Sequence, residues 1–231
     1  AADSRFSETR RAMGISAAMH DFGKTMMVCA MEHEIPHQHV AWEWFDYGQT
    51  LALLPMNGMR SSVVITLPAQ SVQDLMAMSE EDFNQDIEVR FQHRLGAMHL
   101  ISTRHAYPLV TVYPDRFVAQ RFALVGDAAV GMHPVTAHGF NFGLRGADTL
   151  AREIKAAYSR GGDIAAADLL ARYERTHRRA TRPLFLATHA IAKLYSNDSL
   201  PARLLRGATL RIGNRIVPFK RAVANLLTEV N

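Results

Sequence analysis

The chain has one cysteine, Cys29, among its 231 residues. A single cysteine excludes an internal disulfide framework, and its place in the apolar run 26–31 favours a buried, unreactive thiol. No apolar run approaches the roughly 18 residues of a transmembrane helix. No signal peptide, internal repeat or low-complexity tract is recognisable either. We therefore expect a globular, cytoplasmic protein that is long enough for one or two domains.

Charge is spread unevenly along the chain. Residues 152–231 hold 15 Lys/Arg and 6 Asp/Glu, net +9, whereas residues 1–151 hold 11 and 16, net −5. The basic C-terminal third suggests an anionic partner, such as a membrane surface or an acidic protein reached through basic helices, with peripheral membrane association as one consequence. A solvated basic helical face explains the charge equally well. The aromatic interleaving of nucleic-acid binders is absent, so we expect no nucleic-acid partner.

The segment Arg121–Leu150 carries the clearest functional pattern. Phe122–Val125 is a short apolar run typical of a buried strand, and a Gly-Asp pair ends it. A glycine-rich loop follows, and a helical pattern begins at about Leu144. This order places a carboxylate at the carboxyl end of a strand and backbone N–H groups at a helix start. Such a site suits a ligand with both hydroxyl groups and anionic or electron-rich oxygens, although an ordinary turn between strand and helix is the plain alternative.

The letters GDAA, then Pro134, then AHGFNFGLRGAD resemble the second flavin-contact motif of the single-component FAD monooxygenases, the aromatic-ring hydroxylases. Within that class the chain most resembles the ubiquinone-biosynthesis hydroxylases, in particular the 5-demethoxyubiquinol hydroxylases. The resemblance implies that Asp127 hydrogen-bonds the ribityl chain and that Pro134–Asn141 lies against the isoalloxazine ring. A helix N-terminus there stabilises the negative charge of reduced flavin. The implied cofactor contacts are Gly126, Asp127, Pro134, Gly139, Phe140 and Asn141.

The motif departs from the family pattern at three positions. Val130 stands where histidine is common, and Ala137-His138 replaces the Gly-Gln that precedes Gly139 in the family. We expect Ala137 to substitute for glycine only if its φ angle is negative. His138 would either face the flavin or the substrate, or simply fill the place of the glutamine. It is the one candidate for a direct catalytic role.

The first ten residues, AADSRFSETR, resemble the family's middle motif, Gly-Ala-Asp-Gly-x-x-Ser-x-x-Arg, which contacts FAD and pyridine nucleotide. Asp3, Ser7 and Arg10 match, while Ser4 stands where the family has glycine. The resemblance implies that Asp3 and Arg10 contact the cofactor. The alternative is a polar helix start capped by Asp3 or Ser7.

The family's opening G-x-G-x-x-G motif, which follows a strand and holds the pyrophosphate, does not occur in the sequence. We therefore expect the chain to be the C-terminal part of a longer flavoprotein. By itself it would bind flavin weakly or not at all, and it would be inactive.

The pattern predicts an α+β fold that is part of an α/β FAD-binding monooxygenase fold. Its expected parts are a remnant of the FAD-binding domain (1–20), an antiparallel β-sheet substrate domain (21–115), a returning FAD-binding segment (116–160) and a C-terminal helical region (161–231). Strands are expected at 25–31, 39–45, 49–54, 61–67, 99–108 and 117–120. Helices are expected over 79–95, with a capping box at Ser79 and Asp82, and over 145–159, 165–195 with a break or kink near Pro183, and 200–231.

Three histidines, His33, His37 and His39, lie close together beside two glutamates. This composition is compatible with a metal site. The segment also contains a proline and reads as a loop between strands, and the expected reaction needs no metal. We therefore interpret it as a solvated loop and expect no metal.

The resemblance implies an FAD-dependent monooxygenase that uses NAD(P)H as electron donor and O2 as co-substrate. It would hydroxylate the aromatic ring of a prenylated ubiquinone precursor through a flavin C4a-hydroperoxide. Two alternatives remain open. One is an FAD hydroxylase of another aromatic substrate, and the other is a truncated, non-catalytic module that binds a lipid or a biosynthetic partner.

Overall fold

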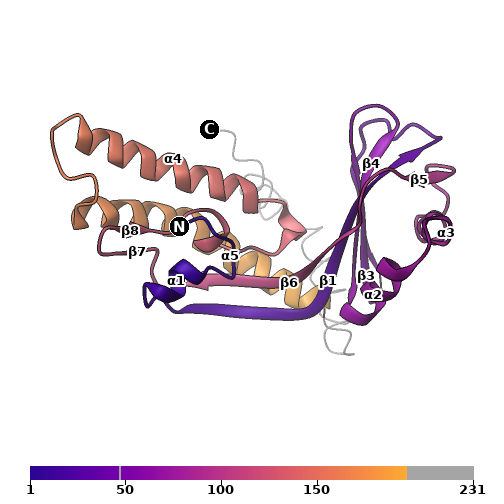
Figure 1. Cartoon of the computed structure of the whole chain (residues 1–231), viewed down its shortest axis with the longest axis horizontal. Helices are drawn as coiled ribbons and strands as arrows, with labels where there is room; N and C mark the ends of the chain where they lie inside the picture. The colour runs from indigo at the N-terminus through magenta and orange to yellow at the C-terminus, as the bar shows by residue number, and fades with distance from the viewer. Residues whose placement is uncertain (47, 197–231) are drawn as a thin grey trace, which may run out of the picture. The chain divides into compact units, whose positions relative to one another are not determined.

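The computed structural model describes residues 1–46 and 48–196 (Figure 1). The predicted helix over 200–231 lies outside the described residues. The chain divides into two compact units, one formed by Ala1–His20 together with Val110–Asn231 and the other by Asp21–Leu109. The predicted parts 1–20 and 116–160 therefore belong to one unit, which also contains the described portion of 161–231.

The unit Asp21–Leu109 is built on an antiparallel sheet, as expected from the predicted strands of residues 21–115. Its strands follow the order β2-β3-β4-β1-β5, and another strand, β6, also pairs with β1. In register, Trp42 lies opposite Leu53, Leu53 opposite Val63, and Val63 opposite Cys29, so side chains of matching burial share one face. The strand bounds are β1 Ala17–His33, β2 Trp42–Asp46, β3 Gln49–Pro55, β4 Arg60–Pro68, β5 Met98–Leu100 and β6 His105–Pro114.

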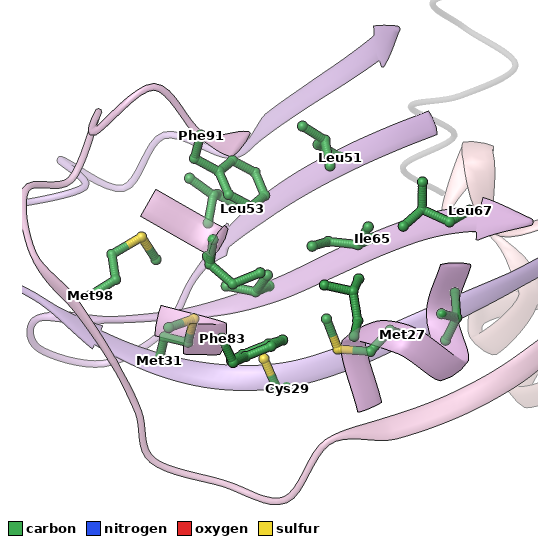
Figure 2. Close-up of a cluster of buried hydrophobic side chains, with 14 of the residues drawn as sticks. Met27, Cys29, Met31, Leu51, Leu53, Ile65, Leu67, Phe83, Phe91 and Met98 are labelled. Carbon is green, nitrogen blue, oxygen red and sulfur yellow. The ribbon is translucent and has the colours of Figure 1, made fainter. Parts of the chain in front are cut away.

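Two helices, α2 (Ala69–Ala77) and α3 (Glu80–Arg90), supply side chains to the core of this sheet. Figure 2 shows Phe83 and Phe91 among methionine, leucine and isoleucine side chains of the strands. Cys29 is buried in this cluster, which confirms the predicted buried thiol, and burial raises the pKa of the thiol to about 12. The labelled core side chains are Met27, Cys29, Met31, Leu51, Leu53, Ile65, Leu67, Phe83, Phe91 and Met98.

The capping box predicted for α3 is present only in part: Ser79 caps the helix, but the Asp82 carboxylate accepts from the Ser79 hydroxyl rather than from the Ser79 backbone N–H. The Ser79 hydroxyl accepts a hydrogen bond from the Asp82 N–H at 3.1 Å and donates one to the Asp82 carboxylate at 2.7 Å. The helix ends at Arg90 rather than at residue 95, because Gln92 and His93 adopt φ angles of 54° and 51°, which no right-handed helix can contain. Helix α2 was not expected, although its buried Val72 and Leu75 are spaced as on one helical face.

The interpretation of the histidine segment as a solvated loop is wrong for two of its three histidines. His33 and His37 are buried, and their rings meet edge to face with centroids 5.5 Å apart. The Nε2 atom of His33 lies 3.0 Å from the Ser61 hydroxyl, and that of His37 lies 3.0 Å from the carbonyl of Met56. Within residues 1–46 and 48–196, no group of three potential ligands can hold a metal ion.

The other unit combines two long helices with short strands and turns. Helix α4 (Gly139–Tyr158) begins five residues earlier than predicted, and α5 (Ala167–Ser196) is a single helix that contains Pro183. The predicted buried strand at 122–125 is reduced to half-buried Phe122–Ala123, with Leu124 buried beyond it. The remaining elements are α1 Glu8–Ala12, β7 Val118–Ala119, β8 Phe122–Ala123, η1 Gly126–Ala128 and η2 Pro134–Thr136. None of the described helices has the length and apolar character needed to cross a membrane.

Ala1 forms the hydrogen-bond pattern of a parallel strand pair with the residues around Leu124. Its amino group donates to the carbonyl of Ala123 at 2.7 Å, and the N–H of Val125 donates to the carbonyl of Ala1 at 2.9 Å. The first residue of the motif AADS is thereby placed beside the segment that leads into Gly126.

A buried histidine joins α4 to α5. His177 is 1% exposed, stacks on Tyr173 and has no hydrogen-bond partner for either ring nitrogen among the described residues. A Cβ atom added to Gly146 would lie 2.8 Å from two atoms of the ring, so only glycine allows this approach. Burial, and then the charge of Arg145, lower the pKa of His177 to about 4.

This histidine makes the stability of the protein dependent on pH. Because the pKa of His177 is lower in the folded chain, the unfolded chain binds the proton more readily. The contribution of His177 to the free energy of unfolding is therefore fully present above about pH 6.5 and decreases as the pH falls toward 4. We predict that proton uptake by His177 on unfolding lowers the free energy of unfolding by about 2 kcal/mol when the pH is changed from 7.5 to 5. Urea unfolding at both pH values, compared with His177→Leu, measures this share. An equal pH dependence in the variant would contradict the prediction.

Candidate functional site

Asp127 lies in a tight turn directly after the segment beside Ala1. Gly126 adopts a φ angle of 61°, in the left-handed region that glycine enters freely, and this turns the chain from extended Val125 into η1. A Cβ atom added to Gly143 of α4 would lie 3.4 Å from the Cα of Gly126, so the missing side chain allows the helix to approach the turn closely. Two glycines of the motif thus bring Asp127 next to the first turns of α4.

Arg5 holds the Asp127 carboxylate. Its Nη2 atom lies 2.7 Å from Oδ2 of Asp127, and its Nη1 atom donates to the carbonyl of Val110 at 2.9 Å. Both partners are partly exposed, with 27% of the Arg5 side chain and 39% of the Asp127 side chain accessible. Sequence reasoning missed Arg5, because it occupies a variable position of the motif and lies 122 residues from its partner.

The structure gives Asp3 a local role. Its carboxylate accepts hydrogen bonds from the Ser7 hydroxyl at 2.6 Å and from the N–H and hydroxyl of Thr9 at 3.1 and 2.9 Å. The Ser7 hydroxyl and then the Thr9 N–H hold the pKa of Asp3 far below its usual value. Ser7 in turn caps α1 by accepting from the N–H of Arg10 at 2.9 Å. The capping alternative is therefore confirmed for this segment, and a cofactor contact of Asp3 stays a prediction.

Arg10 is a buried cation that forms no ion pair with any of the residues that the structure describes. It is 3% exposed, and its Nη1 atom donates to the carbonyl of Arg5 at 3.2 Å. Its Nε atom has no partner among the described residues, and burial lowers its pKa. An arginine is well suited to bind a phosphate or carboxylate group in two-point fashion. The unpartnered donor thus fits the predicted cofactor contact.

The loop before α4 is held by short-range hydrogen bonds and by α5. His133 caps η2 by accepting from the N–H of Val135 at 3.2 Å. The hydroxyl of Thr136 lies 3.3 Å from that of buried Thr188 on α5. The Nδ1 atom of half-buried His138 donates to the carbonyl of Thr136, so this ring is engaged with its own loop. A direct catalytic role of His138 stays a prediction.

The N-terminus of α4 presents free backbone donors. The first bond within the helix runs from the N–H of Phe142 to the carbonyl of His138 at 3.0 Å, so the three preceding N–H groups have no partner within the helix. Among the described residues, no side chain caps this end, and its first turn has no acidic residue. Phe140 is 76% exposed and Asn141 is exposed. This end of a 20-residue helix therefore attracts negative charge and electron-rich oxygens.

The expectation of a negative φ angle at Ala137 is wrong. Ala137 has φ 52° and ψ 21°, in the left-handed region, and ends η2 there. Ser4, which also stands at a family glycine, has φ 98°. The chain thus keeps backbone shapes that favour glycine at two places where it has a side chain instead.

The fold and this site are those of an FAD-binding domain. A family model described as FAD binding domain matches residues 1–185, and the chain belongs to this family. Ubiquinone hydroxylase UbiM of Neisseria meningitidis is 47% identical over 228 residues, which are 99% of this chain and 50% of the relative. Ubiquinone hydroxylase UbiL of Rhodospirillum rubrum is 39% identical over 220 residues, or 95% of this chain and 51% of the relative.

These relatives confirm the resemblance to the ubiquinone-biosynthesis FAD monooxygenases. The chain spans about half the length of the curated relatives it matches. Among solved structures, Klebsiella pneumoniae HpxO, complexed with FAD and uric acid, is 20% identical with a TM-score of 0.70, covering 98% of this chain and 58% of that protein. This likeness concerns the fold.

The two left-handed positions lead to a stability prediction. We expect Ala137→Gly and Ser4→Gly each to raise the free energy of unfolding by about 1 kcal/mol, because glycine removes the steric cost of the left-handed conformation. The matched control is Ala151→Gly on the exposed face of α4, which should lower stability by about the same amount. Denaturant titrations of the three variants provide the comparison. Destabilisation by all three would show that positions 4 and 137 are not strained.

Proposed function

We propose that this chain holds the ribityl and isoalloxazine half of FAD in a monooxygenase that hydroxylates the aromatic ring of a prenylated ubiquinone precursor. The observation that carries the proposal is the carboxylate of Asp127, held by Arg5, close to a helix N-terminus with free N–H groups. The printed names of UbiM and UbiL support the substrate class. NAD(P)H as electron donor and O2 as co-substrate belong to the same proposal.

Each part of the site has a task in this function. Bound FAD supplies the oxygen-transfer chemistry, which side chains cannot provide. Asp127 accepts a hydrogen bond from a ribityl hydroxyl, and the first N–H groups of α4 stabilise negative charge on the pyrimidine edge of the ring. The Arg10 guanidinium, buried with an unused donor, binds an anionic group of the pyridine nucleotide rather than of the flavin.

The sheet offers an apolar surface that suits a prenylated ring. Leu51, Leu53 and the buried apolar side chains of β4 belong to the core cluster, so the alternating residues point to the opposite face. Apart from Arg60 at the start of β4, those residues are apolar or carry a small hydroxyl side chain, and Leu54 is 43% exposed. The opposite face includes Ala52, Leu54, Ser62 and Val64. This surface supports an apolar aromatic substrate over a small polar one.

Flavin binding tests the proposal. Because the described contacts serve the ribityl–isoalloxazine half, we predict that the chain binds riboflavin and FAD with dissociation constants within about threefold of each other. Both should be weak, in the range of about 10 μM to 1 mM. Quenching of flavin fluorescence during titration measures both constants.

Asp127→Asn is the matched variant, and it should weaken riboflavin binding by about tenfold, since an amide is a poorer acceptor than a carboxylate. Failure of the unaltered chain to bind either flavin up to its solubility limit would overturn the proposal.

A stripe of unpaired arginines on α5 supports peripheral contact with an anionic membrane surface, which we propose as a second property of this chain. Arg175, Arg179 and Arg182 are exposed at helical spacing and form no ion pair within the described part of the chain. Nearby Arg172 and Arg178, in contrast, pair with acidic residues. Leu186 continues the same face and is 55% exposed. A row of cations followed by an apolar side chain suits lipid headgroups.

Vesicle sedimentation tests this property. Replacing Arg175, Arg179 and Arg182 by Gln should reduce binding to phosphatidylglycerol vesicles by about 100-fold, at about 1 kcal/mol per cation. Replacing three exposed but ion-paired arginines, Arg11, Arg121 and Arg152, changes the net charge equally and should reduce binding far less. Equal losses in the two triple variants would assign the binding to net charge alone.

A further inference from the structure

The Arg5–Asp127 pair uses only one oxygen of the carboxylate. Arg5 donates to Oδ2, and no other residue in the described part of the chain donates to Asp127. Oδ1 is therefore available as an acceptor on a side chain that is 39% accessible. A carboxylate fixed through one oxygen presents the other in a defined direction, whereas a free carboxylate rotates and loses that direction on average.

Arg5 itself is fixed from several sides. Its second terminal nitrogen donates to the carbonyl of Val110, and its own carbonyl accepts from Arg10. Its stem passes close to Gly131, where an added Cβ atom would lie 3.0 Å from the Cβ of Arg5. Gly131 is held in turn by two backbone hydrogen bonds to Val112, at 2.8 and 3.0 Å. Hydrogen bonds and packing thus hold the guanidinium in one position.

From this geometry we propose that Arg5 is a positioning residue, which orients the Asp127 carboxylate so that its Oδ1 atom meets a ribityl hydroxyl of the flavin. The inference rests on the proposed function and adds to it a residue outside the recognised motif positions. Arg5 touches no ligand in this role. It acts by fixing the acceptor before the ligand arrives, which reduces the ordering cost of binding.

If Arg5 acts through Asp127, its effect on binding depends on the ribityl chain of the ligand. Riboflavin carries the ribityl chain, whereas lumiflavin has the same ring system with a methyl group in its place. Loss of Arg5 should therefore affect riboflavin binding alone. A general collapse of the site would weaken both ligands, because the loop before α4 and the N-terminus of α4 serve the ring.

The experiment titrates riboflavin and lumiflavin into the chain and into Arg5→Gln, with fluorescence as the readout. We expect Arg5→Gln to weaken riboflavin binding about tenfold and to leave lumiflavin binding within about twofold. In an Asp127→Asn background, Arg5→Gln should have no further effect on riboflavin, because the oriented carboxylate is already gone. Arg11→Gln is the control, since Arg11 is exposed and pairs only with Glu8 of its own helix.

Each result decides the matter. Equal weakening of both ligands assigns Arg5 a structural role and overturns the inference, as do unchanged riboflavin binding and independent effects of Arg5→Gln and Asp127→Asn. If the unaltered chain binds lumiflavin or riboflavin, the proposed function stands whatever the variants do, and if it binds neither, both the proposed function and the inference fail.

Should Arg5→Gln not fold, Arg5→Lys replaces it, because an ammonium cannot hold Asp127 and the Val110 carbonyl in the geometry of the guanidinium fork. We expect about threefold weaker riboflavin binding by Arg5→Lys, again with unchanged lumiflavin binding.

Discussion

The site of this protein depends on one side chain, Arg5, which joins three segments that are far apart in the sequence. Its two terminal nitrogens reach the carbonyl of Val110 in β6 and the carboxylate of Asp127 in η1, while its backbone carbonyl receives Arg10. A guanidinium can serve two acceptors at once because its donors are fixed in a plane. One charge-assisted hydrogen-bond network therefore connects the start of the chain, the strand β6 and the turn after Val125. This network fixes the position of the Asp127 carboxylate.

Positive charge gathers around this network even though residues 1–151 are net acidic. Within the described part of the chain, Arg10 is buried and forms no ion pair, and the first turn of α4 adds the partial positive charge of a helix end. Burying an unpaired cation costs stability, which is the physical reason for the proposed contact of Arg10 with an anionic group. This electrostatic character is independent of the family resemblance and agrees with it.

Local sequence patterns predicted the parts that depend on local rules. The strands of the sheet followed from short runs rich in Val, Leu, Thr and aromatic residues, and the Ser79 cap of α3 followed from the preference of a helix start for hydroxyl side chains. The family motif indicated Asp127, but its partner Arg5 could not be found, since ion pairs between distant segments leave no periodic signal. Helix α2 was missed because it is short and follows Pro68 of β4 directly, so that only Val72 and Leu75 show a helical spacing of apolar residues. Ala137 was misjudged because the surrounding hydrogen bonds, rather than its own preference, set its φ angle.

The contact between His177 and Gly146 has a consequence beyond packing. The ring occupies the space that any larger side chain at 146 would fill, so α4 and α5 can approach closely only in one register. Gly146 lies two turns from the start of α4, where the free N–H groups are found. The packing of the His177 ring against Gly146 therefore contributes to the direction in which this helix end points. In this way a buried core histidine affects the direction of the α4 helix dipole at the site.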